Sequence, residues 1–158
     1  MRIALYQPDI AQNAGAIFRL ASVLGVEVDL IGPAGFIISD KKLRRVAMDY
    51  FETASICMHN SWSDYLLFRE RTPNKDGRIV LLTTSADASH LDFSYRQADT
   101  LLVGRETAGV PPEVHGQADA RVRIPMVEGR RSLNVVVAAA IVVGEAFRQT
   151  GLWNNLLN

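Results

Sequence analysis

Apolar residues occur along this chain in short blocks, and their lengths and spacing predict alternating strands and helices. The runs at residues 2–7 and 26–32 are short, rich in Ile, Val and Leu, and followed by proline, which is typical of strands. Between them, apolar side chains recur at the spacing of one buried helix face: Ile17, Leu20, Ala21 and Leu24. Asn13 is placed to cap this helix and Gly25 to end it.

The middle of the chain continues the alternation. Residues 54–59 predict a third strand, and Trp62–Arg71 predicts a helix that ends in a polar loop. Residues 78–84 and 99–104 are nearly continuous apolar runs, as expected for parallel strands that are covered on both faces. Strands that alternate with helices in this way predict an α/β fold with a parallel sheet.

The last segment, residues 132–150, is almost wholly apolar as far as Val143. Its valines favour a strand locally, but the segment is too long for one, and Gly151 is placed to end a helix. A helix that is apolar nearly all round is buried on several sides. In a chain of 158 residues, we therefore expect a partner subunit to cover this helix together with the sheet.

Composition narrows the class of protein. The length fits one domain, and 48% hydrophobic with 22% charged residues is typical of a globular protein. The chain contains no signal-peptide pattern and no apolar run long enough to cross a bilayer, so we expect a cytoplasmic protein without a membrane partner. The 17 basic and 17 acidic residues balance, which argues against nucleic-acid binding by bulk charge but leaves local patches open.

The cysteine and histidine residues do not form a metal-binding pattern in the sequence. Cys57 is the single cysteine, and the three histidines are scattered along the chain. We therefore expect neither an intrachain disulfide nor a metal site.

Three loops collect residues that a core does not need. The first follows strand 2–7 and contains Asn13, Gly15 and Arg19, at the carboxyl end of a strand, where open α/β sheets bind ligands. A capped helix with a solvated arginine would use the same residues.

The second loop, in "LLVGRETAGVP", places Gly104, Glu106 and Gly109 directly after another strand. Glycines allow the backbone to approach a ligand closely, and Glu106 adds a carboxylate at the edge of the sheet. The chain contains neither a dinucleotide-binding nor a P-loop fingerprint.

The third loop, "RIPMVEGRRSLN", leaves a short strand at Ile124 and enters the last helix. Ser132 is a natural N-cap there. Arg130 and Arg131 beside a helix N-terminus make a site that favours anions, which is more than a cap requires.

In order and spacing, "NAGAIFRLA", "LLVGRETAGVP" and "IPMVEGRRSLN" with the later "GEAFRQTG" resemble the three motifs of the SPOUT methyltransferases. The resemblance covers residues 1–158 as one domain without an added RNA-binding domain, and it is strongest to members that methylate the ribose 2'-hydroxyl of the wobble nucleotide of tRNA. It implies an α/β fold in which helices flank a parallel sheet and the C-terminal segment forms a deep trefoil knot, which general rules of chain topology would not predict. It also implies a homodimer and S-adenosylmethionine as cofactor.

Matched by position, the resemblance assigns two sets of site residues. The cofactor is expected beside Leu82, Thr83, Thr84, Gly104, Glu106, Ile124, Met126, Ser132 and Leu133. The catalytic set is Arg19, Glu106, Ser132 and Asn134. Because a guanidinium is essentially always protonated, we expect Arg19 to stabilise an oxyanion or the adjacent phosphate, not to act as a base. The chain departs from many relatives after Asn134, where three valines replace leucine, serine and asparagine.

The resemblance also implies the RNA partner. We expect the anticodon stem-loop of tRNA, with cytidine or modified uridine at position 34 and leucine tRNAs as substrates. The RNA is expected at Asn13, Lys41, Lys42, Arg44, Arg45, Arg130 and Arg131. The basic stretch from Asp40 is predicted to be helical, and a solvated helix face is its alternative interpretation. Two other functions stay open: 2'-O-methylation of another tRNA or rRNA position, and RNA binding without catalysis.

Overall fold

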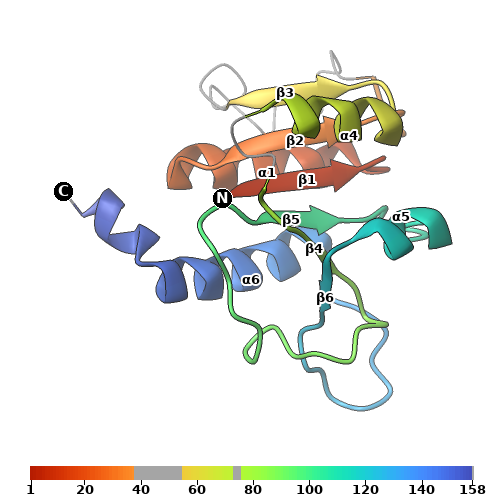
Figure 1. Cartoon of the computed structure of the whole chain (residues 1–158). Coiled ribbons are helices and arrows are strands. Elements are labelled where there is room, and N and C mark those ends of the chain that lie inside the picture. Colours follow the sequence, from red (N-terminus) through yellow and green to blue (C-terminus); the bar gives the residue numbers. More distant parts are fainter. Residues whose placement is uncertain (38–54, 73–75, 158) are drawn as a thin grey trace.

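The computed structural model of the chain describes residues 1–37, 55–72 and 76–157, and its described strands form one six-stranded sheet (Figure 1). The strands are β1 (Arg2–Tyr6), β2 (Glu27–Ile31), β3 (Ile56–His59), β4 (Ile79–Leu82), β5 (Thr100–Val103) and β6 (Ala120–Val122). Their order across the sheet is β3-β2-β1-β5-β4-β6, and each neighbouring pair is parallel. The predicted α/β fold with a parallel sheet is confirmed.

Helices cover both faces of this sheet. They are α1 (Ala11–Leu24), α4 (Trp62–Arg71), α5 (Pro112–Gln117) and α6 (Val135–Thr150), and the 3-10 helix η1 (Leu152–Leu156) follows α6. Helices α1 and α6 share one hydrophobic core with Ile3 and Leu5 of β1, whereas α4 and α5 share a second core with Ala4 and Tyr6. Because successive strand residues point to opposite faces, the uninterrupted apolar run of β1 supplies both cores.

The predicted helix ends are correct at the two glycines. Gly25 ends α1 and Gly151 ends α6, with φ angles of 65° and 72°. Both lie in the left-handed region, where glycine has no Cβ to clash with the backbone.

The predicted N-caps of α1 and α6 are wrong, whereas α4 starts at Trp62 as predicted. Asn13 does not cap α1: it lies inside the first turn, and the N-cap, Ile10, makes no side-chain bond. Helix α6 starts at Val135, and its cap is Asn134 instead of Ser132. The side chain of Asn13 is bonded to the distant Glu106. At α6, the side chain of Asn134 accepts from the N–H groups of Val136 and Val137.

Within the described chain, the sheet covers only one side of α6. Its buried residues are Ala139, Val142, Val143, Ala146 and Phe147. On another side, Val137 is 48% exposed and Ile141 is 40% exposed. Trp153 of η1 packs edge-on against Phe147 and is itself 41% exposed. Apolar surface on this helix and on η1, which was not predicted, is therefore left uncovered.

The predicted basic helix with Lys41, Lys42, Arg44 and Arg45 lies outside the described residues. None of the described helices is long and apolar enough to cross a membrane.

The strand order reverses between β1 and β5. From β1 the chain continues outward through β2 and β3, whereas β5, β4 and β6 lie on the other side of β1. The carboxyl ends of β1 and β5 are therefore adjacent at the switch point, where open α/β sheets bind ligands. The loops after these two strands are the first two of the three loops that the sequence predicts to carry site residues.

Candidate active site

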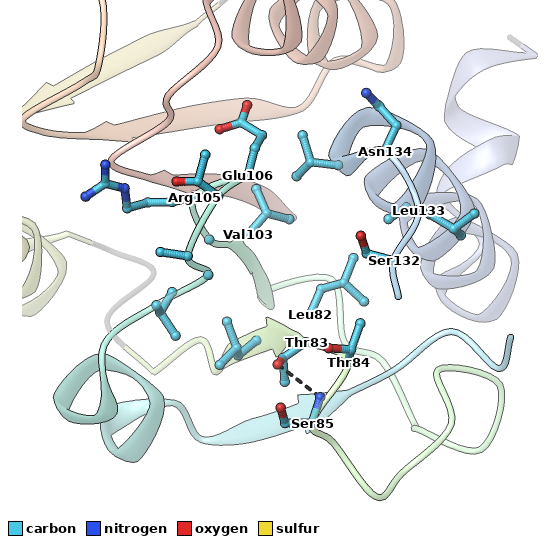
Figure 2. Close-up of a pocket in the computed structure, with 18 of the residues that line it drawn as sticks. Leu82, Thr83, Thr84, Ser85, Val103, Arg105, Glu106, Ser132, Leu133 and Asn134 are labelled. Carbon is cyan, nitrogen blue, oxygen red and sulfur yellow. Dashed lines mark hydrogen bonds between the residues drawn. The ribbon is translucent and has the colours of Figure 1, made fainter. Parts of the chain in front are cut away.

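A cleft of about 660 Å³ lies at the carboxyl edge of the sheet. Its walls come from the start of α1, from the loops after β4, β5 and β6, and from the first turn of α6 (Figure 2). A volume in the range of roughly 300–1,000 Å³ is usual for a small-molecule site. The parallel strands bring these loops together, because all their carboxyl ends meet at one edge.

Every residue that the resemblance assigns to the cofactor lines this cleft: Leu82, Thr83, Thr84, Gly104, Glu106, Ile124, Met126, Ser132 and Leu133. Apolar side chains and hydroxyl groups share the surface. The backbone N–H of Ser85 donates to the hydroxyl of Thr83 at 3.3 Å, which turns the chain at the end of β4 (Figure 2). The cleft thus combines apolar walls with a small number of polar groups, as ligand sites do.

The carboxylate of Glu106 joins the second loop to the first. One oxygen accepts a hydrogen bond from the backbone N–H of Asp9 at 2.8 Å, and the other accepts from the side-chain amide of Asn13 at 3.0 Å. Figure 2 shows this carboxylate pointing away from Thr83 and Thr84. Because both oxygens already hold a donor, Glu106 is suited to orienting the loops.

Asn134 joins the third loop to the first. Its Nδ2 donates to Oδ1 of Asn13 at 3.2 Å, and its own Oδ1 accepts from the backbone N–H groups of Val136 and Val137 at 2.9 and 3.4 Å. Glu106, Asn13 and Asn134 therefore form one chain of hydrogen bonds across all three loops. This chain explains why Asn13 is unavailable as a helix cap.

Gly104 allows the second loop to fold back on itself. A Cβ at this position would lie 2.6 Å from the carbonyl carbon of Gly109. Arg105 and Gly109 exchange two backbone hydrogen bonds of 2.9 Å each, and Gly109 has a φ of 66°. Both glycines are thus needed for the tight turn that presents Glu106.

The remaining predicted residues divide between the cleft and its surroundings. Ser132 and Arg131 line the cleft, and Arg130 is exposed on the same loop. Arg19 lies on the exposed side of α1 and is not among the described residues that line the cleft. The structure therefore brings together Glu106, Ser132 and Asn134, but not Arg19.

Four further residues at or beside the cleft were not predicted from the sequence: Asp9, Arg105, Thr107 and His115. The hydrogen bonds from Arg105 and then Thr107 hold the pKa of Asp9 below its usual 3.8. Opposite charges in the two loops that follow neighbouring strands were the available signal for this pair. His115 lines the cleft from α5, and its Nδ1 accepts from Nε of Arg121 at 3.2 Å; no sequence pattern marks it.

Comparisons with known proteins agree with this geometry. The model of the SpoU rRNA Methylase family matches residues 1–144. A protein of Beijerinckia indica subsp. indica named tRNA (cytidine(34)-2'-O)-methyltransferase is 50% identical over 149 residues, covering 94% of this chain and 91% of that protein. A solved structure described as "Structural insights into the 2-OH methylation of C/U34 on tRNA" matches with a TM-score of 0.86 at 37% identity, covering 94% of both chains.

A third match is a more distant relative with a bound ligand. The SpoU methyltransferase AviRb of Streptomyces viridochromogenes, in complex with the cofactor AdoMet, has a TM-score of 0.86 at 27% identity, over 94% of this chain and 57% of its own. The resemblance to RNA methyltransferases that the three loop motifs indicated is confirmed. A family match that spans most of the chain, and a relative that shares half of the aligned residues, make this protein a methyltransferase of the SpoU rRNA methylase family.

Proposed function

We propose that this protein transfers a methyl group from S-adenosylmethionine to the ribose 2'-hydroxyl of nucleotide 34, the wobble nucleotide, of tRNA. The observation that carries the proposal is the convergence of all three motif loops on one cleft, joined by Glu106, Asn13 and Asn134. The relatives named for this reaction align with nearly the whole chain, which supports it.

The cleft fits the cofactor chemically. S-adenosylmethionine presents an apolar ring between polar ends, and the cleft offers Leu82, Ile124 and Leu133 beside the hydroxyls of Thr83 and Thr84. When bound, the cofactor supplies an electrophilic methyl group on a sulfonium. The remaining task of the protein is to align a ribose hydroxyl with that group and to stabilise the charge that develops.

The described residues divide this task. Glu106 and Asn13 hold two walls of the cleft together through their mutual hydrogen bond. The hydroxyl of Ser132, which also lines the cleft, can donate to or accept from a ribose. Arg19 does not line the cleft of its own chain, so it would contact the substrate from outside that cleft. Its permanent charge suits stabilisation of the oxyanion or of the adjacent phosphate.

A homodimer is part of the proposal. The exposed side chains of Val137 and Ile141 on α6, together with Trp153 and Leu156 of η1, leave apolar surface that a second copy would bury. Burial of such surface is the main favourable term in protein association.

The RNA surface is proposed to include Arg130 and Arg131, which flank the cleft on the third loop. An unpaired anticodon nucleotide can be splayed out and presented to a cleft, which a paired one cannot. The proposed substrate is the anticodon stem-loop of leucine tRNAs, with cytidine or modified uridine at position 34. The proposed location of the protein is the cytoplasm.

We also propose that the segment after β6 is threaded as a trefoil knot. The loop after β6 pairs with the loop after β4, both in the lower part of Figure 1: the backbone N–H of Arg123 donates to Ala88 at 2.9 Å, and its carbonyl accepts from His90 at 2.8 Å. Stretching the unfolded chain from its two ends in optical tweezers should give a contour length shorter than that of an unknotted chain. A full contour length would contradict the knot.

The test of the function is methyl transfer from radiolabelled S-adenosylmethionine to tRNA that lacks wobble methylation, followed by nuclease mapping of the label. Label on the ribose of nucleotide 34, and its absence when that nucleotide is a 2'-deoxynucleotide, is the expected result. Arg19→Ala should abolish turnover while calorimetry still detects cofactor binding. Arg71→Ala, at the exposed end of α4, is the matched control and should retain both.

Other outcomes select other functions. Label at a different nucleotide would retain the methyltransferase and change its substrate position. Cofactor binding and transfer both absent would favour an RNA-binding protein without catalysis.

A further inference from the structure

Asp9 contacts three consecutive residues of the loop after β5. Its backbone N–H donates to Oε2 of Glu106 at 2.8 Å. Its carboxylate accepts from Nη2 and Nε of Arg105 at 2.7 and 3.1 Å, and from the hydroxyl of Thr107 at 2.6 Å. Residue 9 therefore holds Glu106 directly and also holds both neighbours of Glu106 in the sequence.

Both sides of this contact are anchored to other parts of the fold. On one side, a Cβ on Gly35 would lie 3.0 Å from Cα of Asp9, so the chain at Gly35 packs directly against Asp9. On the other side, Arg105 exchanges two backbone hydrogen bonds with Gly109. Because both backbones are already fixed, the ion pair forms without the entropy cost of ordering a mobile loop.

The ion pair is also partly shielded from water. The side chain of Asp9 is 14% exposed and that of Arg105 is 39% exposed. Figure 2 shows the guanidinium of Arg105 directed away from Ser132 and Leu133, on the far side of the cleft from the start of α6. The charge of Arg105 is thus paired with Asp9 and does not point into the interior of the cleft.

We propose that Asp9 and Arg105 form a clip that positions the carboxylate of Glu106 for methyl transfer. The inference rests on the proposed function. Both are positioning residues: they fix the loop, Glu106 then holds Asn13, and Asn13 accepts from Asn134 at the start of α6. Opening the clip displaces Glu106 without removing it, so turnover falls while the apolar walls of the cofactor site remain.

The clip can be tested by a double-mutant cycle in the full-length protein with tRNA as substrate. Asp9→Ala keeps the backbone N–H that bonds Glu106, and Arg105→Met keeps the length of the side chain without its charge. Each should lower kcat by about tenfold, because small misplacements of aligned groups can cost more than that, with the KM for tRNA and the Kd for S-adenosylmethionine within about twofold. The double variant should lose no more than the worse single variant, since both changes open the same clip.

Two further variants make the result specific. Arg105→Lys keeps the positive charge and one donor nitrogen in place of two, and should recover part of kcat. Arg148→Met breaks the ion pair with Glu145 on α6, in which the side chain of Arg148 is 69% exposed, and should leave kcat unchanged. Thermal unfolding of each variant establishes that it is folded at the assay temperature.

Several outcomes would overturn the clip. Additive losses in the double variant would mean that the two residues act separately. A higher KM for tRNA in Arg105→Met with unchanged kcat would mean that Arg105 binds RNA. If the wild-type protein methylates no tRNA, the proposed function fails. The clip is then tested by amide hydrogen exchange instead of by kinetics. Exchange at Gly109, whose backbone N–H donates to Arg105, must then accelerate alike in both single variants, and unchanged exchange would reject the clip.

Discussion

The side-chain amide of Asn134 bonds to Asn13, 121 positions away in the sequence, through Nδ2 at 3.2 Å from Oδ1 of Asn13. At the same time, Oδ1 of Asn134 accepts from the backbone N–H of Val136 at 2.9 Å. One side chain therefore both begins α6 and connects the third loop to the first. The two roles use different atoms of the amide, so substitutions can separate them.

Asn134→Ala removes both roles, whereas Asn134→Ser removes only the bond to Asn13. Because serine caps a helix about as well as asparagine and alanine does not, the alanine variant should lose about 1 kcal/mol of unfolding free energy and the serine variant far less. Both should lose turnover to a similar extent. Urea unfolding and steady-state kinetics measure the two effects, and equal destabilisation of both variants would contradict the capping role.

Gly104→Ala tests the tight turn after β5. Its Cβ would lie 2.6 Å from the backbone of Gly109, so the loop must shift and the free energy of unfolding should fall by about 2 kcal/mol. The cofactor site should weaken as well, because Gly104 lines the cleft. Calorimetric titration with S-adenosylmethionine and urea unfolding report on both changes.

Gly116→Ala is the matched control for this turn. A Cβ at Gly116 meets nothing within 4 Å, and the residue lies in α5. Alanine there should leave cofactor binding unchanged and should raise stability by up to about 1 kcal/mol, because it favours the helix. If both alanine variants bound the cofactor equally well, close packing at Gly104 would not matter for the site.

Local patterns predicted the elements of this fold more successfully than the N-caps of α1 and α6. The apolar runs that became β4 and β5 are legible because burial on both faces requires continuous apolar residues. Asn13 and Asn134 have the same capping preference, yet only Asn134 caps, because Glu106, 93 positions from Asn13, takes up the side chain of Asn13. Such a bond depends on strand order, which no local pattern contains.

In the site, too, some features were predicted from the sequence and others were not. Motif resemblance identified the residues that line the cleft, since they are matched by position and spacing. The contact between Asp9 and Arg105 was missed, because it depends on two loops being adjacent at the switch point between β1 and β5. The opposite charges of Asp9 and Arg105 are a signal in the sequence, but they indicate a contact only once the topology makes the two loops neighbours.

The proposed dimer predicts that Val137→Glu converts the protein to a monomer. Val137 is 48% exposed on the uncovered side of α6, and burying an unpaired carboxylate in an apolar interface is strongly unfavourable. Sedimentation velocity should then show the mass of one 17.4 kDa chain instead of two. Val127→Glu, on a loop residue that is 77% exposed, should remain dimeric. A wild-type protein that sediments as a monomer would reject the dimer.

The stability of α6 at low pH depends on the contact between Glu145 and the guanidinium of Arg148. Hydrogen bonds from Arg148 and then Gln149 lower the pKa of Glu145 from 4.5 to about 2. Because its pKa is lower in the folded chain, this carboxylate stabilises the fold above pH 4.5, and the contribution is lost as the pH falls towards 2. Arg148→Ala should return the pKa of Glu145 towards its usual value and move that loss to higher pH. A titration of the Glu145 carboxyl carbon by NMR measures the shift, with Arg71→Ala as the control, and equal midpoints in the wild-type protein and Arg148→Ala would contradict the assignment.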